Sequence, residues 1–244
     1  MIFAAGLGTR LKPLTNTLPK ALVPVGGQPL LFHVLTRIRE AGIDEFVINV
    51  HHFAGKICQY LENNDFGADI RISDETEKLL DTGGGIRHAG KMLEGNGWFL
   101  AHNVDILSNL DLKSFIRSGR DNAVAMLAVS ERETNRYLLF DDDMRLVGWT
   151  DTRTNEVKSP FRNLEIEKCR RFAFSGIHLI HDNILKEMEN EPECFPIMDF
   201  YIRNAARLPI YGIECKGLKL LDVGKLSSLA AAEEMLHLQV PVPE

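Results

Sequence analysis

Short apolar runs alternate with amphipathic segments along most of the 244 residues of the chain. Runs made up mostly of apolar side chains are typical of strands that are buried on both faces. Five such runs are Met1–Ala5, Phe46–Val50, Trp98–Ala101, Ala123–Val129 and Leu218–Leu221. Between the first two, apolar residues recur at helical spacing from Pro29 to a stop at Gly42, and this pattern predicts a helix.

Further helical patterns continue the alternation. They cover Phe53–Leu61, Gly85–Leu93, Leu112–Ser118, Asp199–Ala206 and Lys225–Leu238. Strands that are joined through helices pair in parallel, and the helices then cover both faces of the sheet. The sequence therefore predicts an α/β fold: a three-layer, mostly parallel, Rossmann-like mixed sheet with helices on both faces.

A charged segment interrupts this pattern at residues 131–171, where 18 of 41 residues are Asp, Glu, Lys or Arg. Within it, the apolar runs Tyr137–Phe140 and Leu146–Trp149 flank a polar stretch, which predicts a small antiparallel hairpin. Two interpretations stay open for this insertion: a solvated excursion from the fold, or a lid over a binding site.

The composition narrows the class of partner. There are 28 Lys and Arg against 34 Asp and Glu, so the net charge is −6, which argues against a broad nucleic-acid or anionic-membrane surface. Four scattered cysteines without a C-x-x-C pair are typical of reduced, intracellular thiols. No apolar run approaches the roughly 20 residues of a membrane span. We expect a cytoplasmic protein that binds neither nucleic acid nor membrane, although a small anionic ligand stays compatible with this charge.

The segment after the first strand carries the clearest chemical signal. Residues 6–20 read G-L-G-T-R-L-K-P-L-T-N-T-L-P-K. The small residues let backbone N–H groups approach phosphate oxygens, and Arg10 and Lys20 supply positive charge. The dinucleotide-binding fingerprint fails because Leu11 stands where it needs glycine. A near match to the phosphate-binding Walker A pattern at Gly85–Met92 fails because it ends in Met instead of Ser or Thr.

The pattern G-x-G-T-R-x-x-P-x-T-x-x-x-P-K after an N-terminal strand resembles the signature of the sugar-1-phosphate nucleotidylyltransferases. Further segments resemble motifs of that family in the same order: Asp81–Gly85, Asn103–Asp105, Phe174–Ile177 and Asp222–Gly224. The resemblance implies the nucleotide-diphospho-sugar transferase fold as a single domain over residues 1–244. Its nucleotide-binding half would cover about 1–110, and its sugar-binding half, with the charged hairpin, about 111–244.

The family's binding residues carry over to positions that match its motifs. For the nucleotide, the resemblance implies Ala5, Gly6, Gly8, Thr9, Arg10, Gly83 and Gly84. For the sugar, it implies Asn103 and Gly176. Many relatives bind the sugar with a Glu and a Lys, and Glu165, Glu167 and Lys168 lie in the corresponding region of this chain. Val104 replaces the glycine that the family usually has beside its metal-binding aspartate.

Four residues are implied to carry the chemistry, with Arg10, Lys20 and Asp105 as the catalytic set. Arg10 would stabilise the leaving pyrophosphate, and Lys20 would neutralise the α-phosphate and align the attacking sugar phosphate. Asp105 and Asp222 each end an apolar strand, so both should face the carboxyl edge of the sheet, where such folds bind ligands. Carboxylates suit Mg²⁺, and the resemblance implies that these two hold it. The competing interpretation of both is helix N-capping.

The reaction implied is transfer of a nucleotidyl group from a nucleoside triphosphate to a sugar 1-phosphate, with release of pyrophosphate. The resemblance favours members that use UTP and N-acetylmuramate 1-phosphate. GTP with mannose 1-phosphate comes second, and CTP with a phosphorylated alcohol stays open. The alternative of another class is a catalytically silent, nucleotide-sugar-binding regulatory subunit, which would have no need for both metal carboxylates. A monomer or a homodimer is expected.

Overall fold

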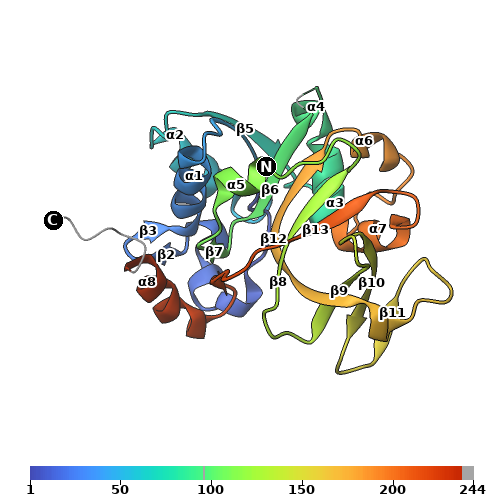
Figure 1. The fold of residues 1–244 in the computed structure, drawn as a ribbon. Coiled ribbons are helices and arrows are strands. Elements are labelled where there is room, and N and C mark those ends of the chain that lie inside the picture. Colours follow the sequence, from blue (N-terminus) through green and yellow to red (C-terminus); the bar gives the residue numbers. More distant parts are fainter. Residues whose placement is uncertain (96, 238–244) are drawn as a thin grey trace. The chain divides into compact units, whose positions relative to one another are not determined.

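The computed structural model describes residues 1–95 and 97–237 (Figure 1). The chain is divided into two compact units. Unit 1 contains Met1–Leu79, His102–Lys113 and the residues from Lys219 onward, whereas unit 2 contains Leu80–Ala101 and Ser114–Leu218. Each unit is thus built from segments that are distant in the sequence. The division into a nucleotide-binding and a sugar-binding half stays a prediction.

Unit 1 contains parallel strands with helical connections. β1 pairs in parallel with β4 on one side and with the end of β6 on the other, and β4 pairs in parallel with β5. These strands are β1 (Ile2–Phe3), β4 (Glu45–Val50), β5 (Asp69–Asp74) and β6 (Trp98–Asn103). The helices between them are α1 (Leu30–Glu40) and α2 (Ala54–Glu62). β6 and α5 (Leu112–Ile116) each run across a boundary between the units.

A second, smaller assembly in unit 1 surrounds an antiparallel ribbon. The ribbon consists of β7 (Ile106–Ser108) and β14 (Leu220–Asp222). Next to it the chain forms β2 (Pro24–Val25), β3 (Gln28–Pro29) and the C-terminal helix α8 (Leu229–His237). A hydrophobic cluster joins these elements: Leu11, Val23, Val25, Leu30, Leu107, Val223 and Ala232.

The prediction of a strand at Leu218–Leu221 that is buried on both faces is wrong in its bounds and in its burial, because the strand observed is Leu220–Asp222. β14 pairs with β7 in a separate two-stranded ladder, and its residues are half-buried or exposed. The reason is that a short ribbon buries one side only; here Leu221 packs against the hydrophobic cluster. The expected C-terminal helix is present, but α8 begins at Leu229 and follows a 3₁₀ turn over Leu226–Ser228. Leu238 lies outside the described residues.

Unit 2 is built around one long strand, β12. β12 pairs antiparallel with β8 and β9, β13 lies parallel to β8, and β10 and β11 extend the sheet beyond β9. The strands are β8 (Ala125–Ser130), β9 (Arg136–Phe140), β10 (Leu146–Asp151), β11 (Glu156–Lys158), β12 (Arg170–His181) and β13 (Ile210–Glu214). The helices are α3 (Asp81–His88), α4 (Gly90–Leu93), α6 (Ile184–Glu187) and α7 (Ile197–Asn204).

The mixed, mostly parallel central sheet with its helices and small antiparallel hairpins confirms the expected fold class. The predicted hairpin in the charged segment is present as β9 and β10, and both strands bury apolar residues. Among the described residues, every helix is too short or too polar to span a membrane.

One buried histidine makes the stability of the fold depend on pH. His102 in β6 is 3% exposed, and its Nδ1 donates to the Asn103 carbonyl oxygen at 2.7 Å. Burial lowers the pKa of His102 to about 4; the Arg37 guanidinium adds to this, and the Asn103 hydrogen bond and the Asp105 carboxylate oppose it. An unfolded histidine has a pKa of about 6.5. Between these two values the unfolded chain binds a proton that the folded chain does not.

We therefore expect the free energy of unfolding to fall as the pH decreases from about 6.5 towards 4. His102→Gln should remove about 2 kcal/mol of the loss between pH 7 and pH 5, because one unit of pKa difference is worth about 1.4 kcal/mol. Urea denaturation of both proteins at the two pH values, in EDTA, measures this difference. An equal loss of stability in the two proteins would contradict the assignment.

Candidate active site

The glycine-rich segment folds back on itself through one residue in the left-handed region. Gly8 has φ +62° and precedes the 3₁₀ turn Thr9–Leu11. A Cβ atom on Gly8 would lie 2.9 Å from Thr15 Cγ2 and 3.1 Å from Lys20 Cβ. The Thr15 hydroxyl donates to the Gly8 carbonyl oxygen at 2.8 Å and closes the loop. Glycine is therefore required here both for its backbone conformation and for the space it leaves.

The start of this loop is held by buried polar side chains. The Ala4 N–H donates to Asn49 Oδ1 at 2.8 Å, and Asn49 Nδ2 donates to Glu75 Oε1 at 2.7 Å. Asn49 and Glu75 are each 3% exposed, so their hydrogen bonds fix the end of β1. Ala5 is buried, whereas a Cβ atom on Gly6 would meet no atom of the described residues within 4 Å. The backbone is therefore fixed at the end of β1, and there is free space around Gly6.

The ribbon of β7 and β14 brings the two predicted metal-binding aspartates together. Asp105 lies in the turn before β7, and Asp222 pairs with Ile106 at the adjoining end of β14. The Val223 N–H donates to the Asp105 carbonyl oxygen at 2.8 Å and extends the ladder by one bond. Residues from the middle and from the last part of the chain thus share one end of a two-stranded ribbon.

Each aspartate has a predicted catalytic cation beside it. Lys20 Nζ donates to Asp105 Oδ2, and Arg10 Nη2 lies 3.9 Å from Asp222 Oδ2. The side chains of Lys20 and Asp105 are 12% and 16% exposed, against 58% and 51% for Arg10 and Asp222. The structure therefore places all four residues in one cluster within unit 1, with an inner and an outer ion pair.

Electrostatic repulsion from the Asp105 carboxylate contributes to a raised pKa at Asp222. Burial raises the pKa of Asp222, the Asp105 carboxylate raises it further, and Lys20 and Arg10 oppose both effects. Added cationic charge would relieve this repulsion, and carboxylate oxygens are the hard ligands that Mg²⁺ prefers. Among the described residues no three His, Cys, Asp or Glu side chains are grouped for a metal. Two carboxylates that leave positions for phosphate oxygens and water fit Mg²⁺ in a phosphoryl-transfer site.

Gly224 leaves space that this cluster needs. A Cβ atom at this position would lie 2.7 Å from both Arg10 Nη2 and Asp222 Oδ1. Any other side chain would push the guanidinium and the carboxylate away from their present positions. In the sequence, only the resemblance of Asp222–Gly224 to a family motif indicates that glycine is needed at position 224.

The predicted nucleobase residues Gly83 and Gly84 lie in α3 of unit 2 and are buried. Both of their N–H groups donate to the Phe195 carbonyl oxygen, at 2.9 and 3.2 Å. A Cβ atom on Gly83 would lie 2.3 Å from the Phe195 ring, and one on Gly84 would lie 2.4 Å from the Glu193 carbonyl oxygen. These glycines therefore permit close packing of α3 on residues 193–195. Their contact with a nucleobase stays a prediction.

α3 begins with a strained residue that composition and spacing do not reveal. Asp81 has φ +60°, which is uncommon for a residue with a side chain. Its Oδ1 accepts a hydrogen bond from the Thr82 N–H at 2.6 Å, and the Thr82 hydroxyl accepts one from the Ile197 N–H at 2.9 Å. Strained backbone often occurs at binding sites, so Asp81 joins the candidate residues of this motif.

Gly176 marks an irregularity in β12. Its φ is +72°, and the pairing with β8 shifts register between Phe174 and His178. Next to it, the Ser175 hydroxyl is buried and has no hydrogen-bond partner among the described residues. β-Bulges are common next to active sites, where they redirect a side chain. The sugar-binding role of Gly176 stays a prediction, as does that of Asn103 at the end of β6 in unit 1.

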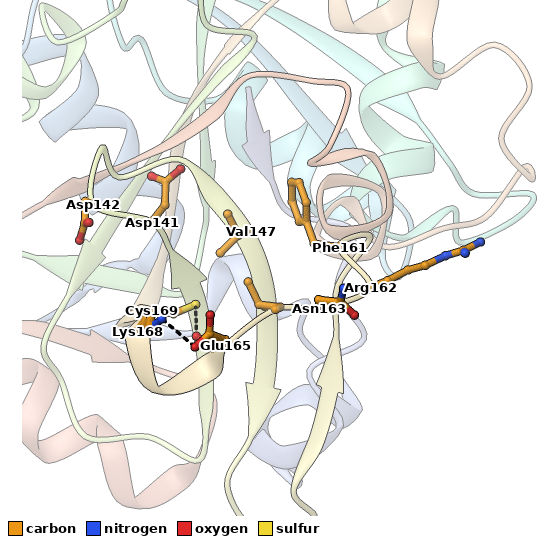
Figure 2. A pocket seen from close by; sticks show the side chains of 10 residues that line it. Asp141, Asp142, Val147, Phe161, Arg162, Asn163, Glu165, Lys168 and Cys169 are labelled. Atoms are coloured by element: carbon orange, nitrogen blue, oxygen red, sulfur yellow. Dashed lines mark hydrogen bonds and ion pairs between the residues drawn. The ribbon is translucent and has the colours of Figure 1, made fainter.

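The charged insertion in unit 2 contains a surface cavity of about 530 Å³ (Figure 2). Glu165 and Lys168 form an ion pair of 2.7 Å at one wall, where the Cys169 thiol donates to the Glu165 carbonyl oxygen at 3.4 Å. In Figure 2 the Arg162 side chain extends away from this wall. Glu165 and Lys168 thus bind each other in this structure. Sugar binding by Glu165, Glu167 and Lys168 stays a prediction.

Comparisons with known proteins identify the family of the chain. Residues 1–141 match the family model described as nucleotidyl transferase. An N-acetylmuramate alpha-1-phosphate uridylyltransferase from Caulobacter vibrioides is 31% identical over 242 residues, which cover 97% of this chain and 96% of that protein. A mannose-1-phosphate guanylyltransferase from Arabidopsis thaliana is 25% identical over 92% of this chain and 61% of its own length.

Among solved structures, a UDP-glucose pyrophosphorylase from Acinetobacter baumanii matches with a TM-score of 0.79 at 17% identity, covering 98% of this chain and 93% of that one. This match shows the shared fold. The sequence matches show the family: the chain belongs to the nucleotidyl transferase family, among the sugar-1-phosphate nucleotidylyltransferases. The resemblance expected from the glycine-rich segment is confirmed.

We expect Gly224→Ala to lower the rate of nucleotidyl transfer by about tenfold or more, because its methyl group displaces Arg10 and Asp222, and small misplacements of catalytic groups are costly. Steady-state rates together with thermal unfolding measure the effect. The matched control is Gly55→Ala in α2, where an added Cβ atom meets no described atom within 4 Å. A fully active Gly224→Ala enzyme would show that this space is not needed.

Proposed function

We propose that the chain transfers a uridylyl group from UTP to N-acetylmuramate 1-phosphate and releases pyrophosphate. The observation that carries the transfer chemistry is the four-residue cluster, in which Lys20 lies against Asp105 and Arg10 lies beside Asp222. The full-length similarity to a uridylyltransferase of that specificity supports the choice of substrates. GTP with mannose 1-phosphate is the second candidate, because guanylyltransferases align with most of the chain. CTP with a phosphorylated alcohol is the third.

In this reaction a phosphate oxygen of the sugar 1-phosphate attacks the α-phosphorus of the triphosphate. A new P–O bond forms, and the bond from the α-phosphorus to the bridging oxygen of the pyrophosphate breaks. The attacking oxygen is already anionic near neutral pH, so it needs no general base. The protein must align two anions that repel each other and stabilise the charge on the leaving group.

The cations of the cluster suit that task. Lys20, the inner and more buried cation, would neutralise the α-phosphate and hold the attacking phosphate in line. Arg10, on the outer and more exposed side, would bind the β- and γ-phosphates. Backbone groups of Gly6, Gly8 and Thr9 would contact the nucleotide along the loop. To bind phosphate, Lys20 has to exchange its hydrogen bond with Asp105 for one with the substrate.

Asp105 and Asp222 would hold Mg²⁺. When bound, the ion supplies positive charge at the phosphate oxygens. The two residues themselves provide negative charge at a fixed place, because the ribbon register sets their spacing. A silent, nucleotide-sugar-binding subunit would need only the loop and the cations. The retention of both carboxylates in one cluster with both cations supports catalysis instead.

The test is pyrophosphate release measured over a matrix of UTP, GTP and CTP against N-acetylmuramate 1-phosphate, mannose 1-phosphate and phosphocholine, with and without Mg²⁺. We expect Mg²⁺-dependent release, fastest with UTP and N-acetylmuramate 1-phosphate. Release only with GTP and mannose 1-phosphate would overturn the substrate assignment. Binding of a nucleotide sugar without release from any pair would favour the silent subunit.

Lys20→Ala and Asp105→Asn should stay folded and lose about 10²-fold or more in turnover, as is typical when one pre-organised charge is removed. Turnover with the best substrate pair and circular dichroism of each variant test this. Lys91→Ala, which removes an exposed lysine from α4, is the control. Near-normal turnover in either site variant would contradict the assigned roles.

Lys20→Met should also bind Mn²⁺ more tightly than the wild-type chain when no nucleotide is present. Removal of the ammonium group leaves the Asp105 carboxylate without its cation, and the remaining negative charge attracts a divalent ion more strongly. Electron paramagnetic resonance of free Mn²⁺ measures the affinity, with Lys91→Met as the control. Unchanged or weaker binding in Lys20→Met would show that Lys20 does not compete for Asp105.

A further inference from the structure

The ribbon that carries the aspartates is too small to hold its own position. β7 and β14 are three residues each and form a separate two-stranded sheet. Isolated two-stranded ribbons are marginally stable in water, so this one depends on its neighbours. On one side, Leu107 and Val223 pack in the hydrophobic cluster of unit 1. Such packing is strong but not directional.

A directional contact is made at the other end of β7 by Arg37, in the last turn of α1. Its Nη1 donates to the Ser108 carbonyl oxygen and, at 3.2 Å, to the Ser108 hydroxyl. Its Nη2 donates to the Leu110 carbonyl oxygen at 2.5 Å. The guanidinium therefore spans two backbone carbonyl groups that are two residues apart.

Burial disfavours the charged form of Arg37. Arg37 is half-buried, and burial lowers the pKa of its guanidinium, an effect that the Glu40 carboxylate opposes. The oxygen atoms that accept its hydrogen bonds are neutral. Neutral acceptors stabilise a buried cation less than a carboxylate does. A planar fork with fixed donor directions gives orientation as well as attraction, and a lysine ammonium group cannot reproduce that.

We propose that Arg37 is a positioning residue that fixes the place of Asp105 and Asp222 through the β7–β14 ribbon. Ser108, which Arg37 binds, is the last residue of β7, and Asp105 lies three residues before it, in the turn that leads into this strand. The register then transmits this position to β14, because Ser108 pairs with Leu220 and Ile106 pairs with Asp222. The proposal rests on the proposed function, in which those carboxylates hold the metal.

Arg37 has an alternative role that must be separated from this one. A cation in the last turn of a helix interacts favourably with the helix dipole. Arg39 lies in the same turn, is exposed, and packs over Gly67. Arg39→Met therefore removes a cation from the same helix end without touching the ribbon, and it is the matched control for Arg37→Met and Arg37→Lys.

The experiment compares kcat, the KM for UTP, the Mg²⁺ concentration that gives half-maximal rate, and Mn²⁺ binding to the nucleotide-free chain. In both Arg37 variants we expect kcat to fall about tenfold or more and the half-saturating Mg²⁺ concentration to rise about fivefold or more, with weaker Mn²⁺ binding. The KM for UTP should change less than about twofold, because the loop that begins at Ala5 is held by the Asn49 and Thr15 side chains and not by the ribbon. Arg39→Met should match the wild type.

Wild-type kcat and metal dependence in folded Arg37→Lys would overturn the proposal, and so would an equal loss in Arg39→Met. If Arg37→Met fails to fold, Arg37→Lys decides, since it keeps the charge and loses only the fork. A rise in the KM for UTP that equals the fall in kcat/KM would also overturn it. Failure of the proposed function is distinct: the wild type then releases no pyrophosphate, while Mn²⁺ binding still compares Arg37→Lys with the wild type.

Discussion

Two carboxylates held close together are the constraint on which the rest of the site depends. Asp105 and Asp222 repel each other, and the rise in the pKa of Asp222 shows that burial and this repulsion act in the same direction. The chain compensates with Lys20 against one and Arg10 beside the other. The cluster is thus formally neutral although the whole chain carries a charge of −6. Local arrangement, and not net charge, makes the site suitable for anionic substrates.

Several independent features maintain this arrangement. The Gly8 backbone and the Thr15 hydroxyl close the loop that carries the cations. The ribbon register brings the aspartates together, and Gly224 leaves room for the outer ion pair. None of these features needs a bound ligand, so the site is largely pre-organised. Pre-organised charge is the main source of catalysis in phosphoryl transfer, where the protein contributes little covalent chemistry.

The sequence predicts the fold class from local patterns, and it predicts the four residues of the cluster through the resemblance of short motifs to those of a family. Apolar runs identify β4, β6 and β8, and the glycine-rich pattern identifies Arg10 and Lys20. β12 has no comparable signal, since its twelve residues begin with two arginines and include Ser175 and Gly176. The Arg37 contacts and the strain at Asp81 are also invisible in the sequence, because they depend on which distant segments meet.

The interleaved course of unit 1 has a consequence for the newly made chain. Asp105 and Asp222 are separated by more than a hundred residues, and unit 2 occupies nearly all of the sequence between them. The four-residue cluster therefore cannot assemble on the ribosome until β14 has emerged, however early the glycine-rich loop folds. Contacts this distant in sequence form late because loop closure costs entropy before they are made. Until then the loop and its cations exist without their carboxylate from β14.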